Sequence, residues 1–508
     1  MKGARIVVKC LLERGVTDVF AYPGASIMPL LSEIDKEKRI SLYMNSTEQF
    51  CAFAADGYAR SSGKVGVCIA TSGPGATNLV TGIANANADS IPLVAITGNV
   101  PLSLLGTDAF QEVDIAGITM PITKHNFIVK NIKDLVPTLI SAFEIADSGR
   151  KGPVLVDIPS DLFDADIKFV LPEKKPETPE DYPNLRSVAS LINDSKSPLV
   201  CVGGGVISSG ASEEIKKLVD KLGCPVVSTA MGVGGFDGSD KRFKGIVGVY
   251  STADTGNIIN ECDLFIAVGV RFSDRMLTAL KSGGTRKVVH IDIDDAEIDK
   301  NLSPCGSLTG DAKKILKKLL PLIDKREERK TEKRRDFGES VWSIVSETLP
   351  DAIYTTEVGL HQVEACRKLT VRNPRTLLTS GGLGSMGYGL PAAIGAAIAN
   401  RDKTVINIAG DGSFNMNMQE LSTSVTLGLN MIELVMNNSS LGMIETQVVT
   451  HTRPNYVRTP KIDYKLLASS MGAHGASAEN LAELKKALAE AKDIGGTWLI
   501  EYKMKELI

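Results

Sequence analysis

The stretch TVINIAGDGSFNMNMQELSTSVTLGLNMIELVMNN, residues 404–438, decides the fold class. Its two apolar runs, 404–409 and 432–436, predict buried parallel strands, and the helical pattern between them predicts a crossover helix. Such a crossover is right-handed and places the carboxyl ends of both strands at one edge of the sheet. The side chains that follow the two strands, Asp411 and Asn438, are therefore expected to meet there.

This pair of side chains suggests a metal site. A carboxylate and an amide are hard oxygen ligands of the kind that Mg²⁺ or Ca²⁺ takes, and a bound diphosphate would supply the remaining charge. Gly410 and Gly412 let backbone N–H groups approach a phosphate, and the following helix start favours negative charge. The simpler alternative is an ordinary turn at 410–412 and an ordinary loop at Asn438. The two motifs together are more specific than either alone.

The alternation of strand and helix patterns extends along the whole chain and predicts an α/β protein with three doubly wound parallel-sheet domains. The other predicted strands are VTDVFAY, GVCIATS, PLVAITG, GPVLVDIP, PLVCVGG, CPVVSTA, DLFIAVG, RKVVHIDI, AIYTTEV and TWLIEY. We predict domains at 1–171, 184–324 and 340–508, joined by a proline-rich linker at 172–183 and a charged linker at 325–339.

Composition excludes several classes of protein. The 508 residues carry a net charge of −3, with 43% hydrophobic and 23% charged residues, so there is no global charge to attract nucleic acid or an anionic membrane. The charge run at 325–335 is interrupted by glutamates, which favours a solvated helix over a nucleic-acid patch. Eight scattered cysteines, no signal-peptide core and no apolar stretch of about 20 residues predict a cytoplasmic protein without membrane spans.

A second candidate site lies near the N-terminus, in NSTEQFCAFAADGYAR (45–60), where Glu48 follows the short run SLYM. By itself this segment is better explained as a glutamate at a helix start. Its pairing with the metal motif changes the interpretation, because the two signatures together resemble those of thiamine diphosphate enzymes.

The resemblance covers nearly the whole chain and is strongest to the acetohydroxyacid synthase (acetolactate synthase) catalytic-subunit family. It rests on these segments: YPG (22–24), TSGPGATN (71–78), GTDAFQE (106–112), KHNF (124–127), GVRFSDR (269–275), HIDID (290–294), TSGGLGSMGYGLPAAIGA (379–396) and GDGSFNMN (410–417). It implies the thiamine diphosphate-binding fold with a central FAD-type domain.

The resemblance also implies the roles of individual residues. Mg²⁺ would lie on Asp411, Asn438 and the backbone carbonyl of Ser440. Glu48 would activate the aminopyrimidine ring as a proton-transfer group, with Gln111 and Lys124 at the substrate. The cofactor-side positions are Pro23, Gly24, Gly359, His361, Gln362, Gly384, Met386, Gly410, Gly412, Ser413, Met416 and Met443. In the family, the residues matching Glu48 and the diphosphate site come from different subunits, which implies a homodimer or homotetramer, with a small regulatory subunit as a further partner.

FAD is the third cofactor implied by the resemblance. The matching positions are Gly203, Gly204, Arg271, Asp274, Arg275, Asp292 and Asp311. Two departures stand out. The Gly-Met-His-Gly flavin segment of the family reads Gly-Val-Tyr-Ser at 248–251, and Gln447 stands where the family has a tryptophan that narrows the second-substrate pocket.

The implied activity is a carboligase of branched-chain amino acid biosynthesis. It would decarboxylate pyruvate and add the hydroxyethyl group to a second 2-oxo acid, giving 2-acetolactate or 2-aceto-2-hydroxybutyrate. Three alternatives stay open: another thiamine diphosphate-dependent 2-oxo acid decarboxylase or lyase, a non-catalytic paralogue, and an FAD oxidase of the pyruvate oxidase kind.

Overall fold

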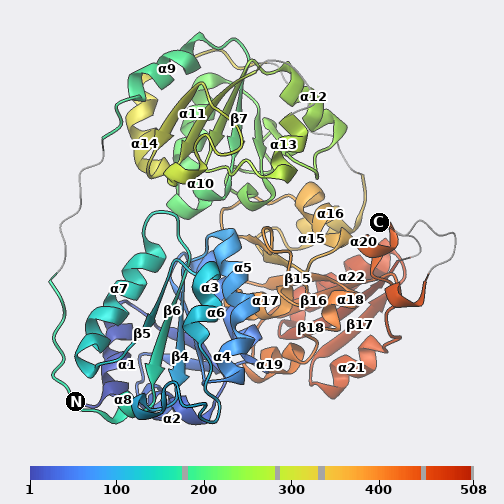
Figure 1. The fold of residues 1–508 in the computed structure, drawn as a ribbon. Coiled ribbons are helices and arrows are strands. Elements are labelled where there is room, and N and C mark those ends of the chain that lie inside the picture. Colours follow the sequence, from blue (N-terminus) through green and yellow to red (C-terminus); the bar gives the residue numbers. More distant parts are fainter. Residues whose placement is uncertain (174–180, 281–285, 330–337, 448–453, 505–508) are drawn as a thin grey trace.

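Three parallel six-stranded sheets, each covered by helices, make up the molecule (Figure 1). A computed structural model describes residues 1–173, 181–280, 286–329, 338–447 and 454–504. Parts of both predicted linkers, 174–180 and 330–337, therefore lie outside the described residues. The prediction of a three-sheet α/β fold is confirmed.

The N-terminal sheet has the order β2-β1-β3-β4-β6-β5. Its strands are β1 (Asp18–Ala21), β2 (Ser41–Met44), β3 (Gly66–Ala70), β4 (Leu93–Asn99), β5 (His125–Ile128) and β6 (Pro153–Pro159). Its helices are α1 (Gly3–Glu13), α2 (Met28–Asp35), α3 (Glu48–Ser62), α4 (Pro74–Asn78), α5 (Val80–Asp89), α6 (Ile115–Thr119), α7 (Leu135–Asp147) and α8 (Asp161–Asp164).

The central sheet has the order β12-β11-β10-β7-β8-β9. Its strands are β7 (Pro198–Val202), β8 (Val226–Ser228), β9 (Phe243–Ile246), β10 (Leu264–Val268), β11 (Lys287–Asp292) and β12 (Gly306–Thr309). Its helices are α9 (Leu185–Asp194), α10 (Gly204–Ser209), α11 (Ser212–Leu222), α12 (Ala253–Glu261), α13 (Asp274–Leu280) and α14 (Ala312–Leu319).

The C-terminal sheet has the order β14-β13-β15-β16-β18-β17. Its strands are β13 (Ile353–Thr356), β14 (Leu377–Thr379), β15 (Val405–Gly410), β16 (Met431–Asn437), β17 (His474–Ala478) and β18 (Thr497–Lys503). Its helices are α15 (Val341–Thr348), α16 (Leu360–Lys368), α17 (Gly389–Ala399), α18 (Asp411–Phe414), α19 (Glu420–Thr426), α20 (Gly442–Glu445), α21 (Tyr464–Ser470) and α22 (Leu481–Ile494).

Strand order identifies where each sheet can bind a ligand. The first and last sheets share one order, in which the first and third strands of the domain are neighbours, whereas the central sheet has the 3-2-1-4-5-6 order of dinucleotide-binding folds. Ligands of doubly wound sheets bind at the carboxyl ends of the strands, where the direction of winding reverses. These points lie between β1 and β3, between β7 and β10, and between β13 and β15.

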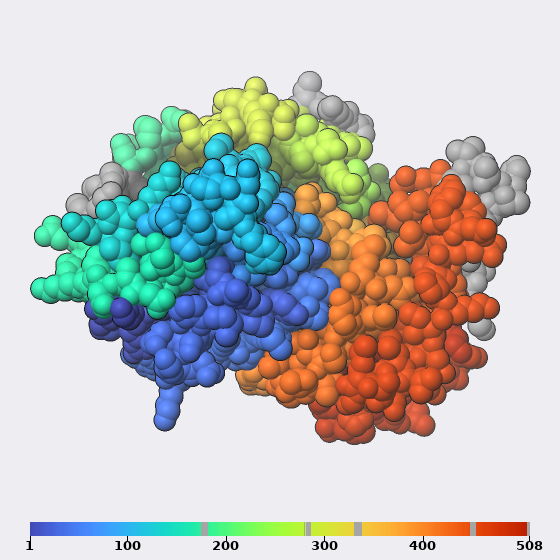
Figure 2. Space-filling view, turned by 60° about the horizontal axis from the view of Figure 1, so that its bottom comes forward, coloured from blue at the N-terminus to red at the C-terminus, as the bar shows by residue number. Residues whose placement is uncertain are grey.

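The N-terminal and C-terminal domains pack side by side, with the central domain across one end of both (Figures 1 and 2). Helices α3 and α17 make the contact and approach so closely that glycine is needed on each. A Cβ on Gly395 would lie 1.8 Å from the Ala54 carbonyl oxygen, and one on Gly57 would lie 2.1 Å from that of Ala392. The pairing of Gly57 with Ala392 and of Ala54 with Gly395 shows that the two helices run antiparallel.

Within the described ranges, no helix is both long and apolar enough to cross a bilayer. The apolar strands of the sheets are buried inside the three domains.

Candidate active site

Asp411 lies at the carboxyl end of β15, where it begins the short helix α18. Its side chain is buried, with 2% of its surface exposed, and its Oδ2 accepts a hydrogen bond from the Thr459 hydroxyl. Burial raises the pKa of the Asp411 carboxyl, while the Thr459 hydroxyl and the backbone N–H groups of Gly412 and Asn438 oppose this shift. A buried carboxylate at a ligand-binding edge is suited to hold a cation.

Asn438 and Ser440 follow β16, the neighbour of β15, so the predicted convergence with Asp411 at one edge is present. The Asn438 side-chain oxygen accepts from the Ser440 N–H at 3.0 Å, which fixes a tight turn. Ser439 completes this turn with a φ of 56°, an uncommon value for a residue with a side chain. The turn holds the Asn438 amide and the Ser440 backbone close to each other.

The diphosphate side of this edge is formed by glycines around His361. A Cβ on Gly359 would lie 2.7 Å from the imidazole Cε1, and one on Gly410 would lie 3.1 Å from it. The ring therefore fits only because both neighbours lack a side chain. Burial lowers the pKa of His361 to about 4, and its Nε2 has no hydrogen-bond partner among the described residues. A buried nitrogen without a partner is the kind of group that a ligand satisfies.

Ser413 and Gly412 complete the turn after β15. The Ser413 hydroxyl donates to the Gly410 carbonyl at 3.1 Å, and the Gly410 N–H donates back to that hydroxyl at 3.2 Å. A Cβ on Gly412 would lie 2.4 Å from the Leu441 side chain, so the turn after β15 and the loop after β16 are in contact. The glycines, the buried Asp411 carboxylate and the unpartnered Nε2 of His361 together fit Mg²⁺ with a diphosphate.

Glu357, which directly follows β13, was not predicted as a site residue but organises the predicted cofactor side. Its fully buried carboxylate accepts from the N–H groups of Gly387 and Gly389 at 2.8 Å each and from Asn417 Nδ2 at 2.5 Å. Burial raises its pKa to about 7, against these donors. Glu357 thus ties the loop before α17 to the segment after α18.

Three predicted cofactor-side positions lie on the segments that Glu357 ties together. Met416 is 51% exposed, and its Cβ would be 3.4 Å from a Cβ on Gly387, next to the half-buried Met386. Gly384 has a φ of 72°, so this loop needs glycine there. Met443 lies half-buried in α20, immediately beyond the Asn438–Ser440 turn.

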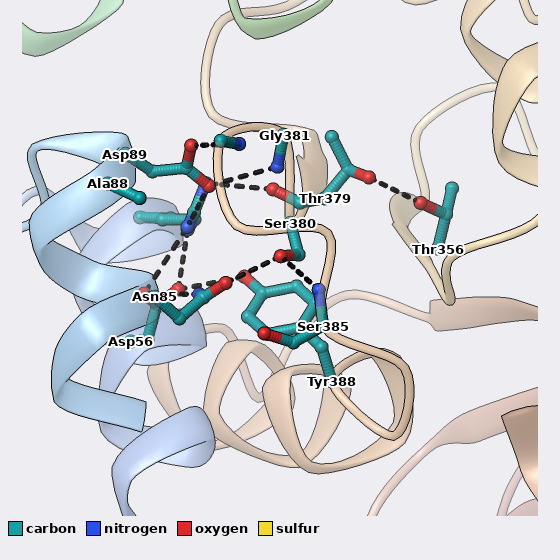
Figure 3. Close-up of polar contacts among 12 residues, drawn as sticks. Asp56, Asn85, Ala88, Asp89, Thr356, Thr379, Ser380, Gly381, Ser385 and Tyr388 are labelled. Atoms are coloured by element: carbon teal, nitrogen blue, oxygen red, sulfur yellow. Dashed lines mark hydrogen bonds and ion pairs between the residues drawn. The ribbon is translucent and has the colours of Figure 1, made fainter. Parts of the chain in front are cut away.

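The loop at 379–388 is also held from the N-terminal domain (Figure 3). Asp89 accepts from the N–H groups of Gly381 and Gly382 at 3.0 and 2.7 Å and from Arg60 at 2.8 Å. Arg60 also donates to Asp56, which accepts from the Tyr388 hydroxyl at 2.8 Å. At the start of the loop, the side-chain amide of the predicted cofactor residue Gln362 donates to the Thr379 hydroxyl at 2.7 Å.

Glu48 is the first residue of α3, as the sequence indicates, and is 8% exposed. Asn78 Nδ2 donates to Glu48 Oε2 at 2.9 Å, and a Cβ on Gly75 would lie 3.1 Å from Glu48 Oε1. Gly24 reaches the same edge, because a Cβ there would lie 2.4 Å from Thr71. Glu48 thus lies beside the turn after β3, at the switch point that also holds Pro23 and Gly24.

The structure brings only one of the two predicted substrate residues to this edge. Gln111 packs against Gly73, where an added Cβ would lie 2.9 Å from the Gln111 Cβ, and its neighbour Phe110 is 89% exposed. Lys124 precedes β5, at the amino end of the sheet. Its ammonium group donates to the carbonyls of Ile145 and Ser148 at the end of α7. Within one chain, Lys124 therefore supports a helix end and does not lie with Glu48.

Glu48 and Asp411 of one chain are far apart. Because α3 and α17 are antiparallel, Glu48, at the start of α3, lies near the C-terminal end of α17. A contact just beyond that end agrees with this: the Arg401 guanidinium carbon lies over the Tyr43 ring of β2, 6.0 Å from the ring centroid. Asp411 follows the opposite end of β15, and a strand of six residues spans roughly 20 Å. A site that uses both carboxylates needs two copies of the chain.

The predicted flavin residues gather around the switch point of the central sheet. Gly203 follows β7 and touches the turn after β10, since a Cβ on it would lie 1.9 Å from the Gly269 carbonyl oxygen; a Cβ on Gly204 would lie 3.4 Å from Met231. Several predicted side chains already bond to protein groups: Arg271 to the Ala88 carbonyl, Arg275 to the Tyr250 hydroxyl, Asp292 to the Asp294 N–H and Asp311 to the Lys314 N–H. Asp274 begins α13. The strand order fits a dinucleotide.

Comparison with known proteins defines the class. Family models match residues 1–118 as the N-terminal TPP binding domain, 185–319 as the central domain and 357–502 as the C-terminal TPP binding domain of thiamine pyrophosphate enzymes. The whole chain superimposes on an X-ray structure described as that of "a putative thiamin diphosphate-dependent enzyme isolated from Mycobacterium smegmatis", with a TM-score of 0.87, full coverage of both chains and 22% identity, which shows the shared fold. The fold and its three domains are those of a thiamine pyrophosphate enzyme.

Curated relatives narrow the family. The chain is 43% identical to the acetolactate synthase of Arthrospira platensis, covering 87% of this chain and 83% of that protein. It is 40% identical to the chloroplastic acetolactate synthase of Arabidopsis thaliana (98% and 81%) and 38% identical to the acetolactate synthase large subunit of Corynebacterium glutamicum (97% and 85%). The chain belongs to the acetolactate synthase catalytic-subunit family of thiamine diphosphate enzymes, which confirms the resemblance found in the sequence.

Proposed function

We propose that the chain is a carboligase that decarboxylates pyruvate and joins the resulting two-carbon unit to a second 2-oxo acid, giving 2-acetolactate or 2-aceto-2-hydroxybutyrate. The observation that carries the proposal is the pair of buried carboxyl groups, Glu48 and Asp411, each at the ligand-binding edge of a thiamine diphosphate-type domain. Identity of about 40% to acetolactate synthases over most of the chain supports the choice of reaction.

The cofactor, when bound, supplies a carbon nucleophile and an electron sink for decarboxylation. The chain's own residues bind and orient it. Asp411, Asn438 and the Ser440 carbonyl would hold Mg²⁺, while His361 and the glycines beside it would receive the diphosphate. Glu48, fixed by Asn78, would hold and move a proton at the aminopyrimidine. Gln111, on the same edge, would contact the substrate.

The functional unit would be a homodimer or a dimer of dimers. Glu48 of one copy would reach the Asp411 edge of the other, because the two groups lie at opposite ends of the α3–α17 pair in one chain. Exposed apolar side chains next to both edges support this arrangement: Phe110 is 89% exposed, Tyr456 71% and Met416 51%. A small regulatory subunit and a cytoplasmic location remain further proposals.

FAD is proposed as a bound but non-reacting dinucleotide of the central domain, on the strength of its 3-2-1-4-5-6 strand order. Tyr250, which departs from the family's flavin segment, bonds to Arg275 through its hydroxyl and to Arg367 through its carbonyl oxygen. These contacts link the central and C-terminal domains at the departure. A flavin absorbance spectrum of the purified protein tests this proposal.

A 2-oxo acid decarboxylase is the second candidate function. It is favoured by one observation: Gln447, at the position of the family's pocket-narrowing tryptophan, is an exposed polar residue just after α20. The two functions differ in whether the two-carbon unit is joined to another acid or released as an aldehyde.

A product assay separates the candidates. The full-length protein is incubated with pyruvate, with and without 2-oxobutyrate, in thiamine diphosphate, Mg²⁺ and FAD. We expect 2-acetolactate, and 2-aceto-2-hydroxybutyrate when 2-oxobutyrate is present. Acetaldehyde alone would favour the decarboxylase. Cofactor binding without consumption of any 2-oxo acid would indicate a non-catalytic paralogue, and bleaching of the flavin by pyruvate would indicate an oxidase.

A further inference from the structure

The segment at 457–459 lies outside every motif discussed above, yet it packs directly on the proposed metal loop. Ser440 and Arg458 form an isolated antiparallel bridge. The Leu441 N–H donates to the Val457 carbonyl at 2.7 Å, and the Thr459 N–H points to the Ser439 carbonyl at 3.5 Å. The backbone hydrogen bonds of this bridge are made by Leu441 and Ser439, the two neighbours of Ser440. The Ser440 carbonyl itself therefore makes no bond to residues 457–459.

The side chain of Thr459 reaches a second proposed ligand. Its hydroxyl donates to Asp411 Oδ2, and its methyl group faces Gly412, where an added Cβ would lie 3.3 Å away. A β-branched side chain has few χ1 choices, so this hydroxyl is held in place without further contacts. Because Asp411 is buried, a hydrogen bond to one of its carboxylate oxygens fixes the direction in which the other oxygen points.

We propose that Thr459 is a positioning residue for the metal: its hydroxyl occupies one oxygen of Asp411 and turns the other toward the cation, while residues 457–459 hold the Ser440 backbone in register. The proposal rests on the proposed function, since it takes Asp411 and Ser440 as the metal ligands. Groups that orient metal ligands in this way commonly control metal affinity, and their loss lowers it by about 10–100-fold.

The test measures metal binding without turnover. Full-length wild-type protein, Thr459→Val and Thr459→Ser are titrated with Mn²⁺ in saturating thiamine diphosphate, and free Mn²⁺ is measured by electron paramagnetic resonance. We expect the valine variant to bind Mn²⁺ about 10–100-fold more weakly and the serine variant, which keeps the hydroxyl, to stay near wild type. Thr426→Val is the matched control, because the Thr426 hydroxyl donates only to the Ser422 carbonyl within α19, at 2.8 Å on the surface.

Unfolding of the metal-free variants is measured in parallel, so that a loss of folding is not mistaken for a loss of metal. The proposal would be overturned if Thr459→Val bound Mn²⁺ with wild-type affinity. It would also be overturned if Thr459→Ser lost as much Mn²⁺ affinity as Thr459→Val, because the hydroxyl would then be irrelevant. If wild-type protein itself binds no Mn²⁺ in the presence of thiamine diphosphate, the proposed metal site and this inference fail together, which distinguishes that result from the failure of Thr459 alone.

Discussion

The buried Arg60 guanidinium donates to the buried Asp89 carboxylate at 2.8 Å, and this ion pair joins α3 and α5 at the face that packs on the C-terminal domain. Asp89 extends the contact to the backbone of the 379–388 loop, on which the predicted cofactor residues Gly384 and Met386 lie. The N-terminal domain therefore holds part of the predicted cofactor edge of its own chain (Figure 3).

Removing Asp89 should destabilise the protein strongly. Asp89→Ala leaves the buried Arg60 with one carboxylate fewer and frees two N–H groups, and breaking a buried ion pair costs about 3–5 kcal/mol. Urea unfolding measures the change. Glu490→Ala, which breaks an exposed pair with Lys486 on α22, is the control and should leave the midpoint unchanged. Equal midpoints for both variants would contradict a structural role for Asp89.

The close contact of α3 with α17 predicts a second loss of stability. A Cβ at Gly395 would overlap the Ala54 carbonyl oxygen at 1.8 Å, so Gly395→Ala must push the helices apart, at a cost of about 1–3 kcal/mol. Gly256→Ala in α12 is matched, because nothing lies within 4 Å of its added Cβ, and alanine there should be neutral or stabilising. In thermal denaturation, the midpoint of Gly395→Ala should fall, whereas the midpoint of Gly256→Ala should stay unchanged or rise.

Glu48→Gln tests the proposed proton-transfer group. The amide keeps the shape and can still accept from Asn78, but it cannot exchange a proton, so turnover of pyruvate should fall by about 10²–10⁴-fold. Thiamine diphosphate affinity, measured by quenching of protein fluorescence, should stay close to wild type. Glu33→Gln, which removes a surface carboxylate paired with Lys36, should keep full activity. A near-normal rate for the Glu48 variant would refute the assignment.

Mixing two inactive variants tests whether the site is shared between copies. Glu48→Gln and Asp411→Ala are each expected to be inactive alone, the second because it loses cofactor. In a mixed dimer, one of the two sites combines an intact Glu48 with an intact Asp411. Random mixing makes half of the dimers mixed, so about a quarter of wild-type activity should return. No recovery after co-expression, with mixed dimers verified by two affinity tags, would show that the site lies within one chain.

His361 should make the stability of the cofactor-free protein depend on pH. Its pKa is lowered to about 4 in the folded chain, from about 6.5 when unfolded. Between these values the unfolded chain binds a proton that the folded chain refuses, so stability falls as the pH decreases. From pH 7.5 to 5.5, wild type should lose about 1–1.5 kcal/mol more than His361→Gln, which has no such group. If the free energy of unfolding fell by the same amount in both proteins between pH 7.5 and pH 5.5, the buried neutral imidazole would be contradicted.

The strands show how far the sequence could predict the fold. All twelve strands predicted from apolar runs are interior strands, and the six strands not predicted, β2, β5, β9, β12, β14 and β17, are the edges of the three sheets. Interior strands of a parallel sheet are covered on both faces and therefore appear as continuous apolar runs. Edge strands such as β2 and β5 are short and partly exposed, so their sequences carry little signal.

Asp411 and Asn438 could be predicted to lie together because each directly follows the end of a strand, β15 and β16. Residues that act from elsewhere could not. Glu357 was missed since an acid after a strand has no specific pattern, and Thr459 was missed since its contact with Asp411 joins segments 48 positions apart. Lys124 was placed at the substrate by resemblance alone, and its position at the amino end of β5 is visible only in the fold.

By itself, the amino-acid sequence determined the three-sheet α/β class, the interior strands and the strand-end positions of Asp411 and Asn438, because hydrophobic periodicity and turn chemistry are local properties of the chain. Only the tertiary structure decided that Glu48 and Asp411 lie at opposite ends of the α3–α17 pair, that Arg60 and Asp89 hold the cofactor loop, and that Thr459 contacts Asp411. These relationships depend on how helices and sheets pack across long separations, which no local pattern records.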